Sequence, residues 1–335
     1  MKEARFYEKL DDRKVHCFLC AHRCVIKEGK RGICAVRENR DGTLYSLVYG
    51  KLVSMNIDPI EKKPLFHFLP GSTSFSIATV GCNFRCEHCQ NYEISQCPKE
   101  RPDIIGRSAE PEEIVDSAAR YGSASISYTY TEPTMFFEFA YDCAKLACER
   151  GIKNVFVSNG YTGPEAVRAI APYLHGNNID LKGDDEFYKK ICGAKLEPVL
   201  NTIRLMKELG VWVEVTTLVI PDHNDSERSL RDIAEFIKSV DRSIPWHVTQ
   251  FYPTYKLMDK PRTPIETLRK ARQIGFETGL LYVYEGNVPG EGGENTYCPQ
   301  CEKLLVKRFG FRISENVVKD GKCPACSFEI AGVWK

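Results

Sequence analysis

The sequence predicts an α/β protein built on a full or partial (β/α) barrel, with small cysteine-rich metal-binding modules at its two ends. In the middle of the chain, short β-rich runs alternate with helical stretches, which is the pattern of a parallel sheet with crossover helices. Several helical stretches begin at Pro or Glu and end at Gly, as helix termini do. Most of the 15 cysteines gather in three groups, near the start, middle and end of the chain.

Seven β-rich runs define the predicted sheet. Six or seven strand–helix units are enough for a full or partial barrel, whose active site would lie on the loops at the carboxyl ends of the strands. The predicted strands cover residues 74–80, 123–130, 154–159, 177–182, 211–220, 246–252 and 280–284.

Six helical stretches separate these strands, and each is long enough to cross from one parallel strand to the next. The predicted helices cover residues 111–122, 134–151, 164–174, 197–210, 226–240 and 264–279.

Polar side chains follow the predicted strands in order, so we expect them on one face of the barrel. These side chains lie in the 82–89 loop, in the segments 130–134 and 158–163, and at Asp180, Lys182, Thr216, Thr217, Gln250, Tyr252 and Tyr255.

The overall charge is balanced, with 46 Lys and Arg against 45 Asp and Glu, and hydrophobic residues make up 43% of the chain. A net charge of +1 gives no electrostatic reason to expect a nucleic acid or a membrane surface as a partner. No apolar run reaches the roughly 20 residues of a membrane span. The first residues lack the apolar segment of a signal peptide. We therefore expect a soluble, cytoplasmic protein.

Clustered cysteines in a cytoplasmic protein indicate metal binding rather than disulfides. Four other cysteines stand alone in the sequence, and we expect them to be buried or structural because free cysteine is among the most buried residue types. These four are Cys97, Cys143, Cys148 and Cys192.

The central group, "CNFRCEHC" at 82–89, follows the first predicted strand. Three buried cysteines on one helix face would also fit this spacing, but most of the neighbouring residues are polar. A zinc site would need a fourth ligand, which His88 or Cys97 could supply. A [4Fe–4S] cluster normally takes four thiolates. With three, one iron stays open to an exogenous ligand, which would make the site reactive.

This Cys-x3-Cys-x2-Cys motif after the first strand of a barrel resembles that of the radical S-adenosylmethionine (SAM) enzymes. The chain is similar to the pyruvate formate-lyase activating enzymes and most of all to the AmmeMemoRadiSam-system branch. The motifs that carry the resemblance are "CFLCAHRCVIKEGKRGICAVREN", "GCNFRCEHCQNYEIS", "YTEPT", "SNGY", "IDLKG" and "CPQC…CPAC". The resemblance implies a [4Fe–4S] cluster with SAM bound to its open iron. It also implies reductive cleavage of SAM to a 5′-deoxyadenosyl radical.

The resemblance also assigns site residues. The cluster ligands would be Cys82, Cys86 and Cys89, and Phe84 would shield the cluster. Glu132 stands where the superfamily has the acid of Gly-Gly-Glu-Pro, which accepts a hydrogen bond from the SAM ammonium. Tyr130 and Thr131 replace the two glycines, which conflicts with close backbone approach to SAM. The alternative for Glu132 is a helix N-terminus, where an acid is also favourable.

Four further residues match SAM-contacting positions of the activating enzymes. Ser158 and Asn159 would meet SAM, although Asn-Gly is also a turn signal. Asp180 and Lys182 share one face of a strand, and SAM carries the complementary carboxylate and ammonium. The alternative to SAM contact by Asp180 and Lys182 is a mutual ion pair at the barrel rim.

One SAM-contacting position departs from the family pattern. The activating enzymes have a histidine after the sixth strand, where this chain has Tyr255. His247 lies too early on its strand to replace it and is expected to be structural.

The two terminal cysteine groups each offer four metal ligands. The C-terminal group, two Cys-x2-Cys pairs, predicts a zinc ribbon or a rubredoxin-like iron site that folds on its metal. The N-terminal group predicts structural zinc or an auxiliary iron–sulfur cluster. The two groups are Cys298, Cys301, Cys323 and Cys326, and Cys17, Cys20, Cys24 and Cys34.

The sequence therefore predicts a radical SAM oxidoreductase with an N-terminal module at 1–70, a barrel at 71–290 and a C-terminal module at 291–335. The resemblance implies an electron donor such as ferredoxin or flavodoxin. It also implies hydrogen abstraction from a substrate that is either a protein residue, as in glycyl-radical activation, or a molecule handled by AMMECR-type and Memo-type partners. The alternatives are an electron-transfer protein with several iron–sulfur centres and a metal-bound scaffold without catalysis.

Overall fold

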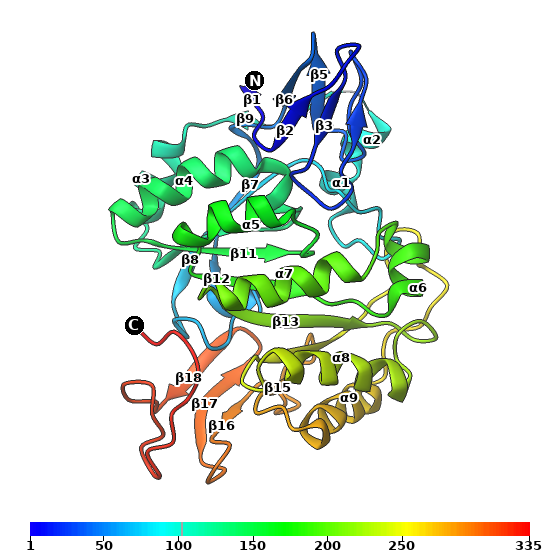
Figure 1. Ribbon diagram of the computed structural model, residues 1–335. Coiled ribbons are helices and arrows are strands. Elements are labelled where there is room, and N and C mark those ends of the chain that lie inside the picture. Colours follow the sequence, from blue (N-terminus) through cyan, green and yellow to red (C-terminus); the bar gives the residue numbers. More distant parts are fainter. Residues whose placement is uncertain (102) are drawn as a thin grey trace.

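A computed structural model describes residues 1–101 and 103–335 of the chain (Figure 1). Its centre is a nine-stranded sheet in the order β15-β14-β13-β12-β11-β10-β8-β7-β9. The strands are β7 (Lys51–Pro59), β8 (Thr73–Thr79), β9 (Arg107–Ser108), β10 (Ser125–Tyr128), β11 (Lys153–Ser158), β12 (Gly176–Asp180), β13 (Trp212–Val219), β14 (Trp246–Gln250) and β15 (Val283–Gly286).

The predicted parallel sheet is confirmed, and it is a partial barrel. Strands β8 and β10 to β15 pair in parallel with their sequence neighbours. The strand order is linear, so β15 and β9 are its two edges. Because parallel strands end together, their carboxyl ends form one rim.

Two strands of the sheet were not expected from the sequence. β7 pairs antiparallel with β8, and the two-residue β9 pairs antiparallel with β7. Only Leu52 and Asp58 of β7 are buried, because β7 lies next to the edge of the sheet. Short, antiparallel closing strands protect such an edge from pairing with another chain.

Helices connect the parallel strands as predicted, and α4, α7 and α9 pack directly against them (Figure 1). The helix bounds are α1 (Tyr92–Ser95), α2 (Cys97–Glu100), α3 (Pro111–Arg120), η2 (Pro133–Phe136), α4 (Phe137–Glu149), α5 (Pro164–Ile170), η3 (Ala171–Tyr173), α6 (Asp185–Phe187), η4 (Tyr188–Cys192), α7 (Glu197–Glu208), α8 (Glu227–Val240) and α9 (Ile265–Thr278); η1 (Ile60–Lys62) precedes β8.

The cysteine-rich ends of the chain are small antiparallel sheets at opposite ends of the molecule (Figure 1). The N-terminal sheets are β1 (Lys2–Glu3), β6 (Thr43–Ser46) and β5 (Arg37–Arg40), and β2 (Tyr7–Lys9), β3 (Val15–Cys17) and β4 (Val25–Ile26). The C-terminal sheet is β16 (Thr296–Tyr297), β17 (Leu304–Phe309) and β18 (Arg312–Asn316).

Several strand ends differ from the prediction. The last strand begins at Val283 rather than at 280. The second ends at Tyr128, because Tyr130 takes a left-handed backbone with φ 64° that no strand can continue. The fourth ends at Asp180, so Lys182 lies just beyond it rather than on it.

Within the described residues, no helix is long and apolar enough to cross a membrane.

Candidate functional site

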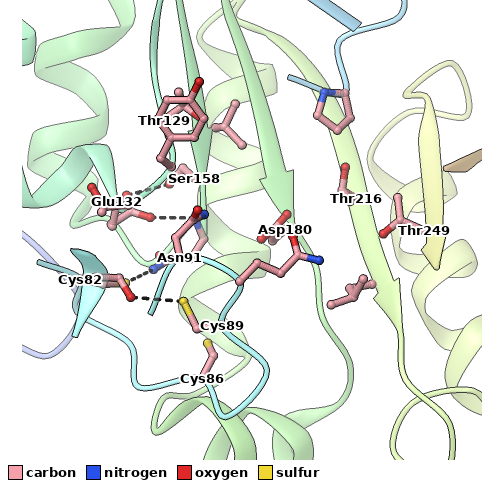
Figure 2. Close-up of a pocket in the computed structure, with 18 of the residues that line it drawn as sticks. Cys82, Cys86, Cys89, Asn91, Thr129, Glu132, Ser158, Asp180, Thr216 and Thr249 are labelled. Carbon is pink, nitrogen blue, oxygen red and sulfur yellow. Dashed lines mark hydrogen bonds between the residues drawn. The ribbon is translucent and has the colours of Figure 1, made fainter. Parts of the chain in front are cut away.

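A cavity of about 560 Å³ opens at the carboxyl ends of the parallel strands, a size typical of small-molecule sites. Figure 2 shows its cysteines on the loop after β8, with Asp180, Thr216 and Thr249 on the strands across from them. The structure brings all nine residues of the predicted cofactor site to its wall: Cys82, Phe84, Cys86, Cys89, Glu132, Ser158, Asn159, Asp180 and Lys182.

The three central thiols share this wall. The Cys82 sulfur accepts hydrogen bonds from the Phe84 amide at 3.4 Å and from Asn159 Nδ2 at 3.7 Å. Cys89 Sγ lies 3.2 Å from Ser95 Oγ. Burial raises the pKa of the Cys82 and Cys89 thiols, so a bound metal is what would ionise them there.

Cys86 has a neighbour that the sequence did not reveal. The Cys192 thiol, at the end of η4, contacts it and raises the pKa of Cys86. Cys192 was expected to stand alone; it is buried as predicted but packs against the central motif. Two backbone hydrogen bonds fix this contact, from the amide of Arg85 to Cys192 O and from the amide of Glu87 to Ile191 O.

The geometry does not favour a single zinc ion at the central motif. Among the described residues, only the C-terminal cysteines bring at least three ligand atoms within 4.8 Å of one another. The candidate fourth ligand His88 lines the cavity, but its Nδ1 has no hydrogen-bond partner among the described residues. Burial lowers the pKa of His88 to about 3, so the ring is neutral.

Glu132 connects two loops of the site. It is the N-cap of η2, and Oε1 accepts hydrogen bonds from Thr134 N at 3.0 Å, Thr134 Oγ1 at 2.6 Å and Ser158 Oγ at 2.9 Å. Oε2 accepts one from Asn159 N at 2.8 Å. The helix-cap alternative is therefore confirmed, and the carboxylate also lines the cavity. Burial raises its pKa despite these four donors.

Asn159 makes the expected turn interaction and also lines the cavity. Its Oδ1 accepts a hydrogen bond from Tyr161 N at 2.9 Å, which is the turn interaction. Its Nδ2 donates to Asn83 Oδ1 at 2.7 Å, beside the Cys82 sulfur. The turn therefore holds the side-chain amide of Asn159 against the 82–89 loop.

Asp180 and Lys182 form the mutual ion pair. Lys182 Nζ lies 2.6 Å from Asp180 Oδ2, and the lysine is only 8% exposed. Burial opposes the charge of Lys182, but Asp180 outweighs it and raises the lysine pKa. Both side chains still line the cavity, so their charges are available to a ligand.

Phe84, within the cysteine loop, is buried among aromatic rings. The ring is 1% exposed, and its centroid lies 5.2 Å from that of Tyr161 and 6.1 Å from that of Tyr188. An apolar layer next to a metal centre lowers the local polarity and excludes water.

The sequence missed a second charged group at the cavity. Lys63 is buried and pairs with Asp58 at 2.6 Å, and burial lowers the Lys63 pKa to about 8. The Tyr130 hydroxyl donates to the same carboxylate, and the Tyr130 ring lies 4.5 Å from Lys63 Nζ. Asp58 and Lys63 come from β7 and the segment after it, which no motif marked.

The C-terminal module also reaches the cavity. Phe311, at the β17–β18 turn, lines the wall together with Asn287. The sequence placed this segment in a separate module after the barrel, and only the return of the chain over the rim brings it here.

His247 and Tyr255 lie outside the cavity wall. His247 Nε2 is 2.7 Å from Glu214 Oε2, and both are buried, so His247 is structural as expected. Tyr255 stacks on Tyr92 with ring centroids 4.6 Å apart.

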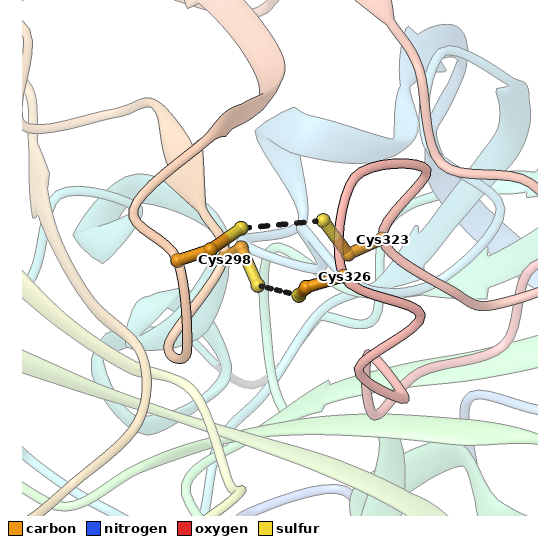
Figure 3. A group of neighbouring side chains, drawn as sticks. Cys298, Cys323 and Cys326 are labelled. Carbon is orange, nitrogen blue, oxygen red and sulfur yellow. Dashed lines mark hydrogen bonds between the residues drawn. The ribbon is translucent and has the colours of Figure 1, made fainter.

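The four C-terminal cysteines form a compact ligand set (Figure 3). Cys298 Sγ lies 3.6 Å from Cys326 Sγ, and Cys301 Sγ lies 3.7 Å from Cys323 Sγ. Four thiols at this spacing fit one tetrahedral ion.

The N-terminal cysteines meet at a different kind of site. All four line one small cavity, together with Leu19, His22, Ile26, Gly32, Ile33, Arg37 and Met135. Their sulfurs are not gathered to the single-ion spacing of the C-terminal set.

Comparison with known proteins agrees with the site. Residues 76–237 match the model of the radical SAM superfamily. The chain is 52% identical over 333 residues to an uncharacterized protein of Methanocaldococcus jannaschii, covering 98% of this chain and 99% of that one. It is 24% identical over 218 residues to a pyruvate formate-lyase-activating enzyme of Clostridium pasteurianum, covering 61% of this chain and 89% of that protein.

The fold has a solved counterpart. The crystal structure of a radical SAM methyltransferase from Sphaerobacter thermophilus superposes with a TM-score of 0.53 at 16% identity, over 71% of each chain. The sheet, the cavity at its rim and the matched sequence model agree. Residues 76–237 of the chain form a radical SAM domain.

Proposed function

We propose that this protein cleaves SAM reductively at the cavity and uses the resulting radical to abstract hydrogen from a residue of a protein substrate. One observation carries the proposal: Cys82, Cys86 and Cys89 face the same cavity as Glu132 and the Asp180–Lys182 pair. When bound there, a [4Fe–4S] cluster would supply an open iron for SAM. It would also supply the electron that breaks the bond between the SAM sulfur and C5′, giving methionine and a 5′-deoxyadenosyl radical.

The cavity residues would position SAM. Glu132 is held by four hydrogen bonds, so its carboxylate is preorganised to accept one from the SAM ammonium. Asp180 and Lys182 carry the charges that complement the ammonium and carboxylate of SAM, and a ligand would exchange their mutual pair for two new ones. Phe84 would keep water from the cysteine loop.

The proposed substrate class rests on similarity and access. A relative is named as an activating enzyme that acts on pyruvate formate-lyase. Phe311 lines the cavity and is 47% exposed, so a segment of another protein could contact this side chain at the mouth of the cavity. We place AMMECR-type and Memo-type proteins among the partners, because the motifs resemble the AmmeMemoRadiSam-system branch.

The test is the Cys86→Ala variant, purified and reconstituted without oxygen. Two thiolates should not hold the cluster, so we expect loss of the iron and sulfide assigned to the centre and no 5′-deoxyadenosine from SAM with dithionite. The matched control is Cys148→Ala, a half-buried cysteine on α4 away from the cavity, which should keep both. Formation of 5′-deoxyadenosine by Cys86→Ala at the wild-type rate would overturn the proposal.

A further inference from the structure

The N-terminal cysteine cavity differs from the C-terminal metal site in one measurable way. In the C-terminal set the four sulfurs lie within 4.8 Å of one another, as a single ion requires. Cys17, Cys20, Cys24 and Cys34 surround a common cavity without reaching that spacing. The N-terminal thiols therefore do not have the single-ion arrangement of the C-terminal set.

A buried guanidinium points to the charge of that ligand. Arg37 is 1% exposed and lines the cysteine cavity. Its Nη2 is bound to Glu138 Oε2 at 2.6 Å, but Nε and Nη1 have no hydrogen-bond partner among the described residues. Unpaired buried donors of a charged group are costly. An anionic acceptor in the cavity, such as the sulfur atoms of a thiolate-bound cluster, would pair them.

The cavity lies next to the central cysteine loop. His22, between Cys20 and Cys24, contacts Asn83 O at 2.9 Å through Nε2, and Asn83 adjoins Cys82. The His22 ring packs on Tyr161 at 4.8 Å, and Tyr161 packs on Phe84 at 5.2 Å. One hydrogen bond and a few covalent bonds thus join the two cysteine groups.

An exposed apolar surface borders the N-terminal group. Cys24 is partly buried, as Cys82 and Cys89 of the central group are. The apolar residues Val25 and Ile33, next to Cys24 and Cys34 in the chain, are 61% and 55% exposed. A protein electron donor could therefore dock on this apolar surface, directly beside the N-terminal group.

We propose that the four N-terminal cysteines hold a second iron–sulfur cluster, paired with Arg37, through which electrons enter the protein. Both [2Fe–2S] and [4Fe–4S] clusters take four cysteine thiolates. In each transfer the donor, a low-potential iron–sulfur or flavin protein, loses one electron and the N-terminal cluster gains it and passes it to the central cluster. No bond forms or breaks. The relay step rests on the proposed function, whereas the second cluster does not.

Occupancy is tested first, with the variant Cys82→Ala/Cys86→Ala/Cys89→Ala, which lacks the central ligands. After anaerobic reconstitution we expect roughly two or four irons with equal sulfide, as cluster types require, and an EPR signal on reduction. Adding Cys24→Ala should remove them. A second zinc besides that of the C-terminal site, with no sulfide, would overturn the proposal. This result is independent of SAM cleavage.

The relay is tested with two reductants on Cys24→Ala in the otherwise native chain. Dithionite is small and should reach the central centre directly, so we expect 5′-deoxyadenosine formation within twofold of wild type. With reduced [4Fe–4S] ferredoxin as the probe we expect at least a tenfold loss. Cys148→Ala should behave as wild type with both reductants. Equal ferredoxin-driven rates in Cys24→Ala and wild type would refute the relay, and failure of wild type with dithionite would refute the proposed function instead.

Discussion

At the scale of single residues, Tyr130 and Glu132 show how this chain departs from its family pattern without losing the site. Tyr130 stands where the superfamily has a glycine, yet its φ of 64° is the conformation that glycine favours. Its hydroxyl bond to Asp58 and its ring contact with Lys63 offset that strain. The loop therefore has the backbone conformation that glycine would favour at this position, and the Tyr130 side chain lines the cavity.

Glu132→Gln should weaken SAM binding. A hydrogen bond to a charged group is worth about 1.5–3 kcal/mol, so we expect a Kd for SAM about 10–150-fold higher by isothermal titration with the reconstituted protein. Some loss of Tm should accompany it, because one of the two carboxylate oxygens becomes an NH2 group, which cannot accept the hydrogen bonds made at that position, either from Thr134 and Ser158 or from Asn159.

The matched control is Glu165→Gln, the same substitution at an exposed acid in the first turn of α5. It should leave the Kd for SAM unchanged. If Glu132→Gln lowered Tm but kept wild-type SAM affinity, Glu132 would be a helix cap only.

At the scale of elements, the segment between η1 and β8 joins the barrel to the C-terminal module. His67 Nδ1 lies 2.6 Å from Ala331 O, and its Nε2 lies 2.5 Å from the Tyr284 hydroxyl. Arg308 of β17 donates to Phe66 O at 2.8 Å and lies 4.3 Å from the Phe66 ring. The module is therefore docked by buried polar contacts.

Acid should loosen this docking. Burial lowers the pKa of His67 to about 4, below its value of about 6.5 in the unfolded chain. Between these values the unfolded state binds the extra proton, so the free energy of unfolding falls as pH falls below 6.5. One unit of pKa corresponds to 1.36 kcal/mol, which gives a loss of about 2 kcal/mol at pH 5.

Denaturant unfolding at pH 7 and pH 5 checks this expectation. His67→Gln should lower stability at pH 7 and show a smaller difference between the two pH values than wild type. His16→Gln, in strand β3 at the surface, should keep the wild-type difference. An unchanged pH dependence in His67→Gln would show that other groups cause the acid effect.

At the scale of the whole molecule, the C-terminal module holds a set of four cysteines that could bind a metal and also contributes to the cavity wall. Its four sulfurs are arranged for one ion, and we propose zinc or a rubredoxin-type iron. Burial opposes ionisation of Cys323, but the amides of Ala325 and Cys326 outweigh it and hold its pKa at about 6, which favours the thiolate that binds metal. The same module places Phe311 at the rim.

Replacing Cys298 and Cys301 by serine should remove one metal ion per chain, because half of the ligand set is lost. The module should lose its fold, since small metal sites supply much of the folding free energy of their domain. SAM cleavage with dithionite should persist, because the central thiols and Glu132 lie on the barrel.

Metal analysis, thermal unfolding and 5′-deoxyadenosine formation measure these three effects. The control replaces Cys148, which belongs to no ligand set, by serine. Loss of SAM cleavage in the Cys298/Cys301 variant alone would make the C-terminal module part of the SAM site.

The sequence by itself determined the parallel sheet, the helix positions and nine of the residues that line the cavity. These follow from local signals: strand–helix alternation, helix-end residues, and motifs placed directly after strands whose ends must share one rim. The four C-terminal thiols could also be predicted from the sequence, because their two Cys-x2-Cys pairs are short-range patterns. Each of these features depends on residues that are close in the chain.

Only the tertiary structure decided the contacts between segments far apart in sequence. The open edge of the barrel, the antiparallel strand β7, the Asp58–Lys63 pair, Cys192 against Cys86, and Phe311 at the cavity have no local signal. The same holds for the unpaired donors of Arg37 beside the N-terminal cysteines. These contacts arise when buried surfaces of separate elements pack together, and packing partners are set by the shape of the whole fold rather than by spacing along the chain.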